Sequence, residues 1–246
     1  MKSAMYRKVM SIDELVKGYI VRRLSRFEVL VDLGGRLEVV HNTNTGRLKD
    51  VLVSGYRALL KPISGRKLKY RLVGIEFYDN QYGIVDTLTQ SKAFEEALKL
   101  KLINYLSDCF VVRRNPKYDS VVFDYLIRCS GEYAVVEVKS AEFRGSNNEA
   151  MYPDCPTLRG RKQLMKLIEL STSGMKTYLI FIAAFPNPRC FKPYREGDAV
   201  IDELVRECVR VGVSVRAVSM FMDGQGNVYL EDTDLPLCSE WLGSWS

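Results

Sequence analysis

Residues 123–139 read FDYLIRCSGEYAVVEVK, and this stretch decides the fold of the C-terminal half. Two apolar runs rich in β-branched and aromatic residues flank Ser130-Gly131, which predicts a β-hairpin. With the turn centred there, antiparallel pairing puts Asp124 opposite Glu137, and strand alternation puts Lys139 on the same face as Glu137. Opposed like charges destabilise a sheet, whereas a bound divalent cation would reverse the sign of that interaction. The hairpin therefore predicts a metal site; the alternative is a solvated ion pair between Glu137 and Lys139.

The composition is that of an ordinary globular protein. The chain has 246 residues, of which 47% are hydrophobic and 27% charged, enough for one large or two small domains. No apolar run reaches the ~18 to 20 residues that span a bilayer, and residues 1–20 lack the apolar segment of a signal peptide. We therefore expect a cytoplasmic protein without a membrane segment. The net charge of +6 is compatible with a nucleic-acid partner, and the oligomeric state stays open.

The six cysteines lie singly along the chain, without a C-x-x-C pair, and the chain has one histidine. This pattern argues against a zinc site. We expect free, mostly buried thiols, with disulfides as the alternative if the source is a hyperthermophile.

Two regions of different character follow one another. Residues 1–88 predict an all-β, OB-like barrel, a fold that commonly binds nucleic acid or oligosaccharides, with strands at 18–24, 27–33, 36–41, 57–61 and 69–77. Residues 89–246 predict an α/β domain, with helices at 89–106, 156–171 and 197–211 and strands at 177–184 and 213–220 besides the hairpin. Thr89 or Ser91 is the expected N-cap of the first helix.

Charged side chains on two predicted helices could extend the hairpin site. Glu96, on helix 89–106, has Leu100 rather than a basic residue at i+4 and could point toward the sheet. Arg159, Lys162, Gln163 and Lys166 share one stripe of the helix at 156–171. Of these, Arg159, Lys162 and Gln163 predict a phosphate clamp, and a solvated basic face is the alternative.

Two segments of the N-terminal region are candidates for nucleic-acid binding. Cations alternate with a tyrosine in residues 66–71, which suits phosphates and a stacked base; the candidates are Arg66, Lys67, Lys69 and Arg71. The loop at 41–47 could cradle an anion through Asn44, Thr45 and Arg47. The alternatives are plain surface charge for the first segment and a turn that caps its own backbone for the second.

Several motifs in order resemble one known family. Residues 137–140 read EVKS, and residues 151–164 read MYPDCPTLRGRKQL, close to the family's FPDA-x-T-x-RG-x-KHL. Residues 41–48, HNTNTGRL, are similar to its H-x-PNTG-x-M, and residues 24–27, LSRF, to its Y-K-R-F. On these motifs the chain resembles the sugar fermentation stimulation protein (SfsA) family, almost throughout up to about residue 220. It departs from the pattern at Thr43, where the family has proline, and at Gln163, where it has histidine.

The resemblance implies an OB-like domain at residues 1–88 and a domain of the PD-(D/E)xK nuclease type at residues 89–246. In that pattern Asp124 is the motif aspartate, Glu137 the second acid, Lys139 the motif lysine and Glu96 the glutamate of the opening helix. The family is described as nucleic-acid-binding and as associated with the regulation of sugar utilisation.

The hypothesis is a metal-dependent nuclease acting on DNA. Asp124 and Glu137, with the carbonyl of Val138, would hold Mg²⁺ or Mn²⁺ through hard oxygen ligands. Lys139 would orient the attacking water, and Glu96 would position the water shell of the metal. Two alternatives remain: a DNA-binding regulator without hydrolysis, and an oligosaccharide-binding OB domain coupled to the second domain.

Overall fold

The computed structural model describes residues 6–65 and 67–243, which divide into two compact units. The first unit contains the chain up to Glu96, residues 184–187 and residues 219–232. The second contains the rest of the described chain. No helix in the described ranges has both the length and the apolar character needed to cross a bilayer. The assignment of residues 1–88 to an OB-like domain and of residues 89–246 to a nuclease-like domain stays a prediction.

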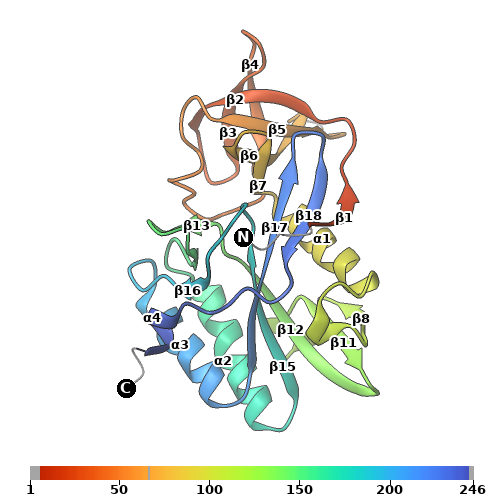
Figure 1. Cartoon of the computed structure of the whole chain (residues 1–246). Coiled ribbons are helices and arrows are strands. Elements are labelled where there is room, and N and C mark those ends of the chain that lie inside the picture. Colours follow the sequence, from red (N-terminus) through yellow and green to blue (C-terminus); the bar gives the residue numbers. More distant parts are fainter. Residues whose placement is uncertain (1–5, 66, 244–246) are drawn as a thin grey trace. The chain divides into compact units, whose positions relative to one another are not determined.

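The first unit is built on a closed ring of five strands (Figure 1). Hydrogen bonds join them in the order β4-β3-β2-β5-β6, and β4 returns to β6 through the pair His41 and Arg71. Apolar side chains from all five strands, including Ile20, Val31 and Leu60, form the core. The strands are β2 (Val16–Arg23), β3 (Glu28–Asp32), β4 (Leu37–His41), β5 (Arg57–Pro62) and β6 (Tyr70–Tyr78). Closure removes exposed strand edges, so the predicted barrel is formed.

Four further strands extend the sheet of the first unit. β7 pairs with the end of β17, β17 pairs with β18, and β18 pairs with β1. Their bounds are β1 (Arg7–Ser11), β7 (Gln81–Ile84), β17 (Ser214–Asp223) and β18 (Asn227–Asp232). The sequence pattern does not reveal β1, β7 and β18, because they are short and because β1 pairs with a strand more than 200 residues away (Arg7 opposite Leu230).

Helix α1 (Thr87–Lys99) is shorter than predicted and has a different N-cap. The N-cap is Asp86, which is fully buried and accepts hydrogen bonds from the backbone N of Thr89 at 3.2 Å and from Thr89 Oγ1 at 2.5 Å. The prediction of Thr89 or Ser91 as the N-cap was therefore wrong. The helix ends because Lys101 takes a positive φ of 55°. The N–H of Lys101 bonds to Leu98 O and that of Leu102 to Ala97 O, the pattern of a Schellman motif. A 3₁₀ turn, η1 (Asn104–Leu106), covers the remaining predicted helix.

The second unit centres on a mixed sheet in the order β17-β15-β12-β11-β8. β8, β11 and β12 pair antiparallel, whereas β12 and β15 pair parallel. Helix α2 packs against β15 and α3 (Figure 1). The bounds are β8 (Cys109–Arg114), β11 (Tyr125–Cys129), β12 (Glu132–Ser140), β15 (Lys176–Ala183), α2 (Leu158–Thr172) and α3 (Ala199–Arg210). The α/β character predicted for this half of the chain is confirmed.

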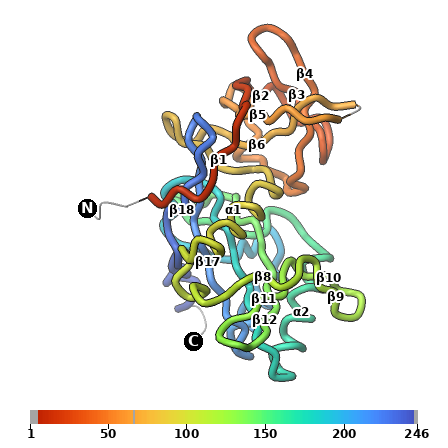
Figure 2. Tube along the Cα trace, turned by 90° about the vertical axis from the view of Figure 1, so that its right-hand side faces the viewer, coloured from red at the N-terminus to blue at the C-terminus, as the bar shows by residue number. Residues whose placement is uncertain are grey.

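Short elements complete the second unit. β9 (Lys117–Tyr118) and β10 (Val121–Val122) form a small ribbon, with β10 contacting α2 (Figure 2). β14 lies between β13 and β16 in a second small sheet. The remaining bounds are β13 (Phe143–Arg144), β14 (Ala150–Tyr152), β16 (Phe191–Pro193) and α4 (Ser239–Leu242).

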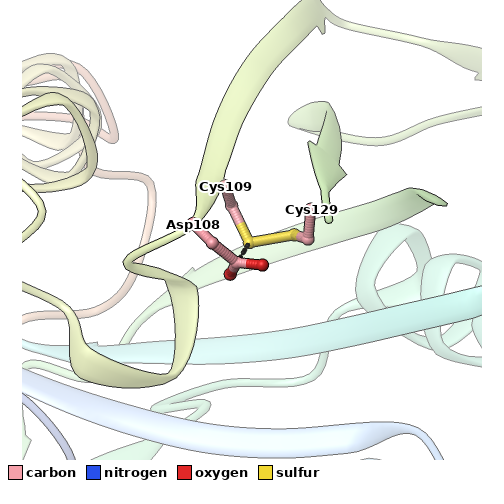
Figure 3. Close-up of side chains that lie close together, drawn as sticks. All are labelled: Asp108, Cys109 and Cys129. Carbon is pink, nitrogen blue, oxygen red and sulfur yellow. Dashed lines mark hydrogen bonds between the residues drawn. A yellow bond between two sulfur atoms is a disulfide. The ribbon is translucent and has the colours of Figure 1, made fainter. Parts of the chain in front are cut away.

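Four of the six cysteines form two disulfides, Cys109–Cys129 and Cys190–Cys238, so the expectation of free thiols was wrong for them. Cys109 and Cys129 are partners in the register of β8 and β11, and Asp108 lies beside their sulfur atoms (Figure 3). Tertiary contacts create both pairs, which is why the linear spacing did not reveal them. Cys155 and Cys208 belong to neither disulfide.

The Cys190–Cys238 bridge should contribute strongly to stability, because it closes a loop with a sequence separation of 48. Restriction of the unfolded chain predicts a contribution of about 4 kcal/mol, or a drop in Tm of about 8 to 16 °C when both residues become serine. Calorimetry of this double variant, with Cys155→Ser as the control, measures the effect. An unchanged Tm, or more than two titratable thiols in the denatured, unreduced protein, would contradict the assignment.

Candidate functional site

The hairpin of β11 and β12 has the predicted register. Ser130 and Gly131 form the turn with φ of 46° and 95°, both in the left-handed region that a type I′ turn requires. Tyr125 lies opposite Val136, and continuing the register by one residue puts Asp124 opposite Glu137. The Oδ2 of Asp124 accepts a hydrogen bond of 2.7 Å from the backbone N of Val138. This bond fixes the aspartate at the start of β11.

Glu137 and Lys139 form a buried pair on β12. Their exposed fractions are 2% and 9%, which is rare for charged side chains without a specific reason. The Nζ of Lys139 donates to Glu137 Oε1 at 2.5 Å and to Gln163 Oε1 at 2.7 Å. The pair is therefore held in one geometry rather than solvated, which rules out the alternative of a solvated ion pair.

One carboxylate oxygen in this cluster has no partner. The Oε2 of Glu137 is buried and makes no hydrogen bond. An unsatisfied buried acceptor costs about 1 to 3 kcal/mol, and more when it is charged. A cation at this oxygen would remove that cost, so the donor set fits a hard divalent metal.

The electrostatics of the two acids indicate the same need for positive charge. Burial raises the pKa of Glu137 to about 7; Lys139 opposes this rise and Asp124 adds to it. Burial also raises the pKa of Asp124, against the hydrogen bond from Val138 and the charge of Lys139. Burial is the largest influence on Lys139 and would lower its pKa, but the charge of Glu137, the hydrogen bond to it and the charges of Tyr152 and Asp124 together outweigh burial and raise the pKa. The cluster thus holds two carboxyl groups that burial disfavours as anions.

Helix α2 brings Gln163 into the site. Thr157 caps this helix by accepting from the N–H of Gly160, as expected for a helix that opens after Pro156. Gln163 is buried, and its Nε2 donates to Val122 O at 2.9 Å, which turns its Oε1 toward Lys139. Because both the nitrogen and the oxygen of the Gln163 carboxamide are hydrogen-bonded, this geometry favours a role in positioning Lys139 over the predicted contact with phosphate.

The other two predicted phosphate contacts lie on the exposed side of α2. Arg159 and Lys162 are both exposed, and the charge of Arg159 lowers the pKa of Asp124 and Glu137. The guanidinium of Arg159 therefore acts electrostatically on both acids. The phosphate role of the two cations remains a prediction.

Tyr152 is a neighbour of the site that sequence analysis did not single out. Burial raises the pKa of its hydroxyl, with the charges of Lys139 and Glu137 acting in opposite directions. A Cβ on Gly160 would come within 2.9 Å of that hydroxyl, so the glycine leaves room for it. The available signal was the motif itself, which has tyrosine where the SfsA pattern quoted above has phenylalanine.

Glu96 is half-buried on α1 and lies in the first unit, whereas Asp124, Glu137 and Lys139 lie in the second. Its catalytic role stays a prediction.

The N-terminal candidates fall into two groups. Thr45, Arg47, Lys67 and Lys69 are exposed. Asn44 is buried, and its Oδ1 accepts from Gly46 N at 2.9 Å, so its side chain shapes the loop as in the capping alternative. Arg66 lies outside the described residues.

Arg71 is held in an ion pair rather than presented to solvent. Its Nε lies 3.1 Å from Oδ2 of the fully buried Asp86. Thr43 Oγ1 donates to the other oxygen of Asp86 at 2.8 Å. The charge of Arg71 therefore compensates Asp86, the residue that caps α1, and its contact with nucleic acid stays a prediction.

Comparison with known proteins places both units in one family. Residues 21–84 match the "SfsA N-terminal OB domain" and residues 88–226 the "Sugar fermentation stimulation protein RE domain". A sugar fermentation stimulation protein homolog of Pyrococcus furiosus is 38% identical over 90% of this chain and 95% of its own length, and one of Archaeoglobus fulgidus is 37% identical over 93% and 98%. A solved structure of Pyrococcus furiosus SfsA in complex with Ca²⁺ covers 94% of this chain and 99% of its own, with a TM-score of 0.89 and 37% identity. The barrel is accordingly an OB domain, and the chain belongs to the sugar fermentation stimulation protein family.

Proposed function

We propose that the chain is a divalent-metal-dependent nuclease whose second unit is of the PD-(D/E)xK type and whose first unit binds the nucleic acid, with DNA as the substrate. The observation that carries the proposal is the buried, unpartnered Oε2 of Glu137, whose pKa is raised further by the charge of a second acid, the half-buried Asp124. The related structure from Pyrococcus furiosus was solved with Ca²⁺, another hard cation that takes carboxylate oxygens. Mg²⁺ or Mn²⁺ is the proposed native ion.

The residues of the site divide the chemistry between them. Asp124 and Glu137 would hold the ion, which when bound polarises a phosphate oxygen and lowers the pKa of a water. Lys139, fixed by Glu137 and Gln163, would orient the water and stabilise negative charge on the phosphate. Arg159 and Lys162 would bind a neighbouring phosphate from the exposed side of α2.

A cleavage assay tests the proposal. End-labelled single- and double-stranded DNA and RNA are incubated with the full chain in Mg²⁺, in Mn²⁺ and in EDTA. Cleavage of DNA with either metal and none in EDTA is the expected result. Tight binding without cleavage under any metal would instead favour a DNA-binding regulator, in which the acidic cluster is structural.

Metal affinity should depend on pH because the proton on Glu137 competes with the cation. With the pKa of Glu137 raised to about 7 in the metal-free protein, about a tenth of the carboxyl is ionised at about pH 6 and nine tenths at about pH 8. The dissociation constant for Mn²⁺ should thus fall about tenfold between these values and level off above them. Isothermal titration in buffers of different ionisation enthalpy also reports the proton released. Equal affinity at both values would show that Glu137 is not a ligand.

A further inference from the structure

A single arginine joins two loops of the OB domain, residues 24–27 and residues 42–56, through hydrogen bonds. The guanidinium of Arg23, at the end of β2, donates to four backbone carbonyl groups, those of Ser25 (2.9 Å), Arg26 (3.0 Å), Gly46 (2.5 Å) and Arg47 (2.5 Å). Asn42 adds two bonds between the same loops, from its backbone N to Phe27 O at 2.8 Å and from its Nδ2 to Arg26 O at 3.2 Å. The two loops therefore form one fixed surface, and side chains that leave it keep a defined spacing.

The side chain of Phe27 is exposed to solvent on this surface. The residue is 50% exposed although its backbone is fixed at both the N–H, which donates to Ser25 Oγ, and the carbonyl, which accepts from Asn42 N. The other phenylalanines of the described part of the first unit are buried or half-buried; Phe77, for example, stacks on Phe185. An exposed aromatic ring on a rigid backbone is a ready platform for another flat group.

Cations lie on the loop whose backbone Arg23 joins to the backbone next to Phe27. Arg47 and Lys49 line an open pocket of about 600 Å³ together with Arg23, and the apolar side chains of Leu48 and Leu52 complete its walls. Exposed Lys67 lies 4.0 Å from the carboxylate of Glu28, the residue after Phe27. The acid Glu28 reduces the local charge but leaves an excess of positive side chains.

We propose that this surface binds single-stranded nucleic acid, with an unpaired base stacked on Phe27 and the flanking phosphates on Arg47 and Lys49. Aromatic rings between cations are the usual means of binding single strands, because every base has a face to stack and every nucleotide a phosphate. A duplex keeps its bases stacked on each other and cannot offer one to Phe27. The inference deepens the proposed function by naming the form of the strand that the first unit holds.

Fluorescence anisotropy of the full chain in EDTA tests the inference, since without metal no cleavage intervenes. The probe is an oligothymidylate of about 12 nucleotides, with an abasic strand of the same length and a duplex beside it. Phe27→Leu should weaken binding of the oligothymidylate about 5- to 150-fold, while binding of the abasic strand stays at the wild-type level. Leu37→Ala, on a side chain that is 61% exposed in the same unit, is the matched control and should bind like the wild type.

Salt dependence separates the two kinds of contact. Arg47→Gln should reduce the slope of log K against log salt by about 1, whereas Phe27→Leu should leave the slope unchanged. Equal losses on normal and abasic strands, wild-type affinity of Phe27→Leu, or tighter binding of the duplex would each overturn the inference. None of these results bears on cleavage in Mn²⁺, which tests the second unit separately.

Discussion

Replacing Asp124 with asparagine is expected to lower the rate of metal-dependent cleavage about 10²- to 10³-fold and to leave nucleic-acid affinity within about twofold. Asparagine keeps an oxygen that can accept from Val138 N, so the start of β11 is preserved. What it loses is an anionic ligand, and metal-ion catalysis supplies several kcal/mol, with about 1.4 kcal/mol for each tenfold in rate. Single-turnover cleavage of end-labelled DNA in Mn²⁺ measures the change.

Asp119→Asn is the matched control for this experiment. Asp119 lies in the same unit, its side chain is 78% exposed, and it pairs with Lys166 outside the proposed site. The control should cleave at the wild-type rate. Equal activity of the wild type and Asp124→Asn would remove Asp124 from the mechanism, even if the protein proved to be a nuclease.

Mn²⁺ is expected to raise the Tm of the wild-type protein by about 5 to 10 °C when present at about 100 times its dissociation constant. Binding to the folded state alone contributes about 2.7 kcal/mol at that concentration, and each kcal/mol moves the Tm of a chain of this size by about 2 to 4 °C. The bound cation would compensate the negative charge of two neighbouring acids, the half-buried Asp124 and the buried Glu137, which has an oxygen without a partner.

The same measurement on Asp124→Asn distinguishes a metal site from a structural acid pair. Without metal its Tm should equal or exceed that of the wild type, because one of two neighbouring acids becomes neutral while the hydrogen bond from Val138 is retained. Added Mn²⁺ should then shift its Tm little. A large metal-induced shift in this variant, or none in the wild type, would argue against a metal at this position.

Local chemistry made the hairpin predictable from the sequence. A Ser-Gly turn fixes the register within ten residues on either side, so Asp124, Glu137 and Lys139 could be aligned without tertiary information. Likewise, Thr157 after Pro156 marked the start of α2, and Ser173-Gly174 marked its end.

Contacts between distant segments were not predictable. Lys139 meets Gln163 across 24 residues, so the helix stripe did not reveal that Gln163 holds the lysine, and its phosphate contact stays a prediction. Arg71 looked like one cation of a basic tract because its partner, Asp86, lies 15 residues further on. The disulfide of Cys190 and Cys238 and the pairing of β1 with β18 depend on tertiary contacts in the same way.

An anomalous difference map from a crystal soaked in Mn²⁺ shows whether Asp124 and Glu137 share one divalent cation beside Lys139. We expect a peak within about 2.0 to 2.6 Å of an oxygen of Asp124 and of Oε2 of Glu137. A map without density between those two carboxylates, in crystals that bind Mn²⁺ elsewhere, would contradict this expectation.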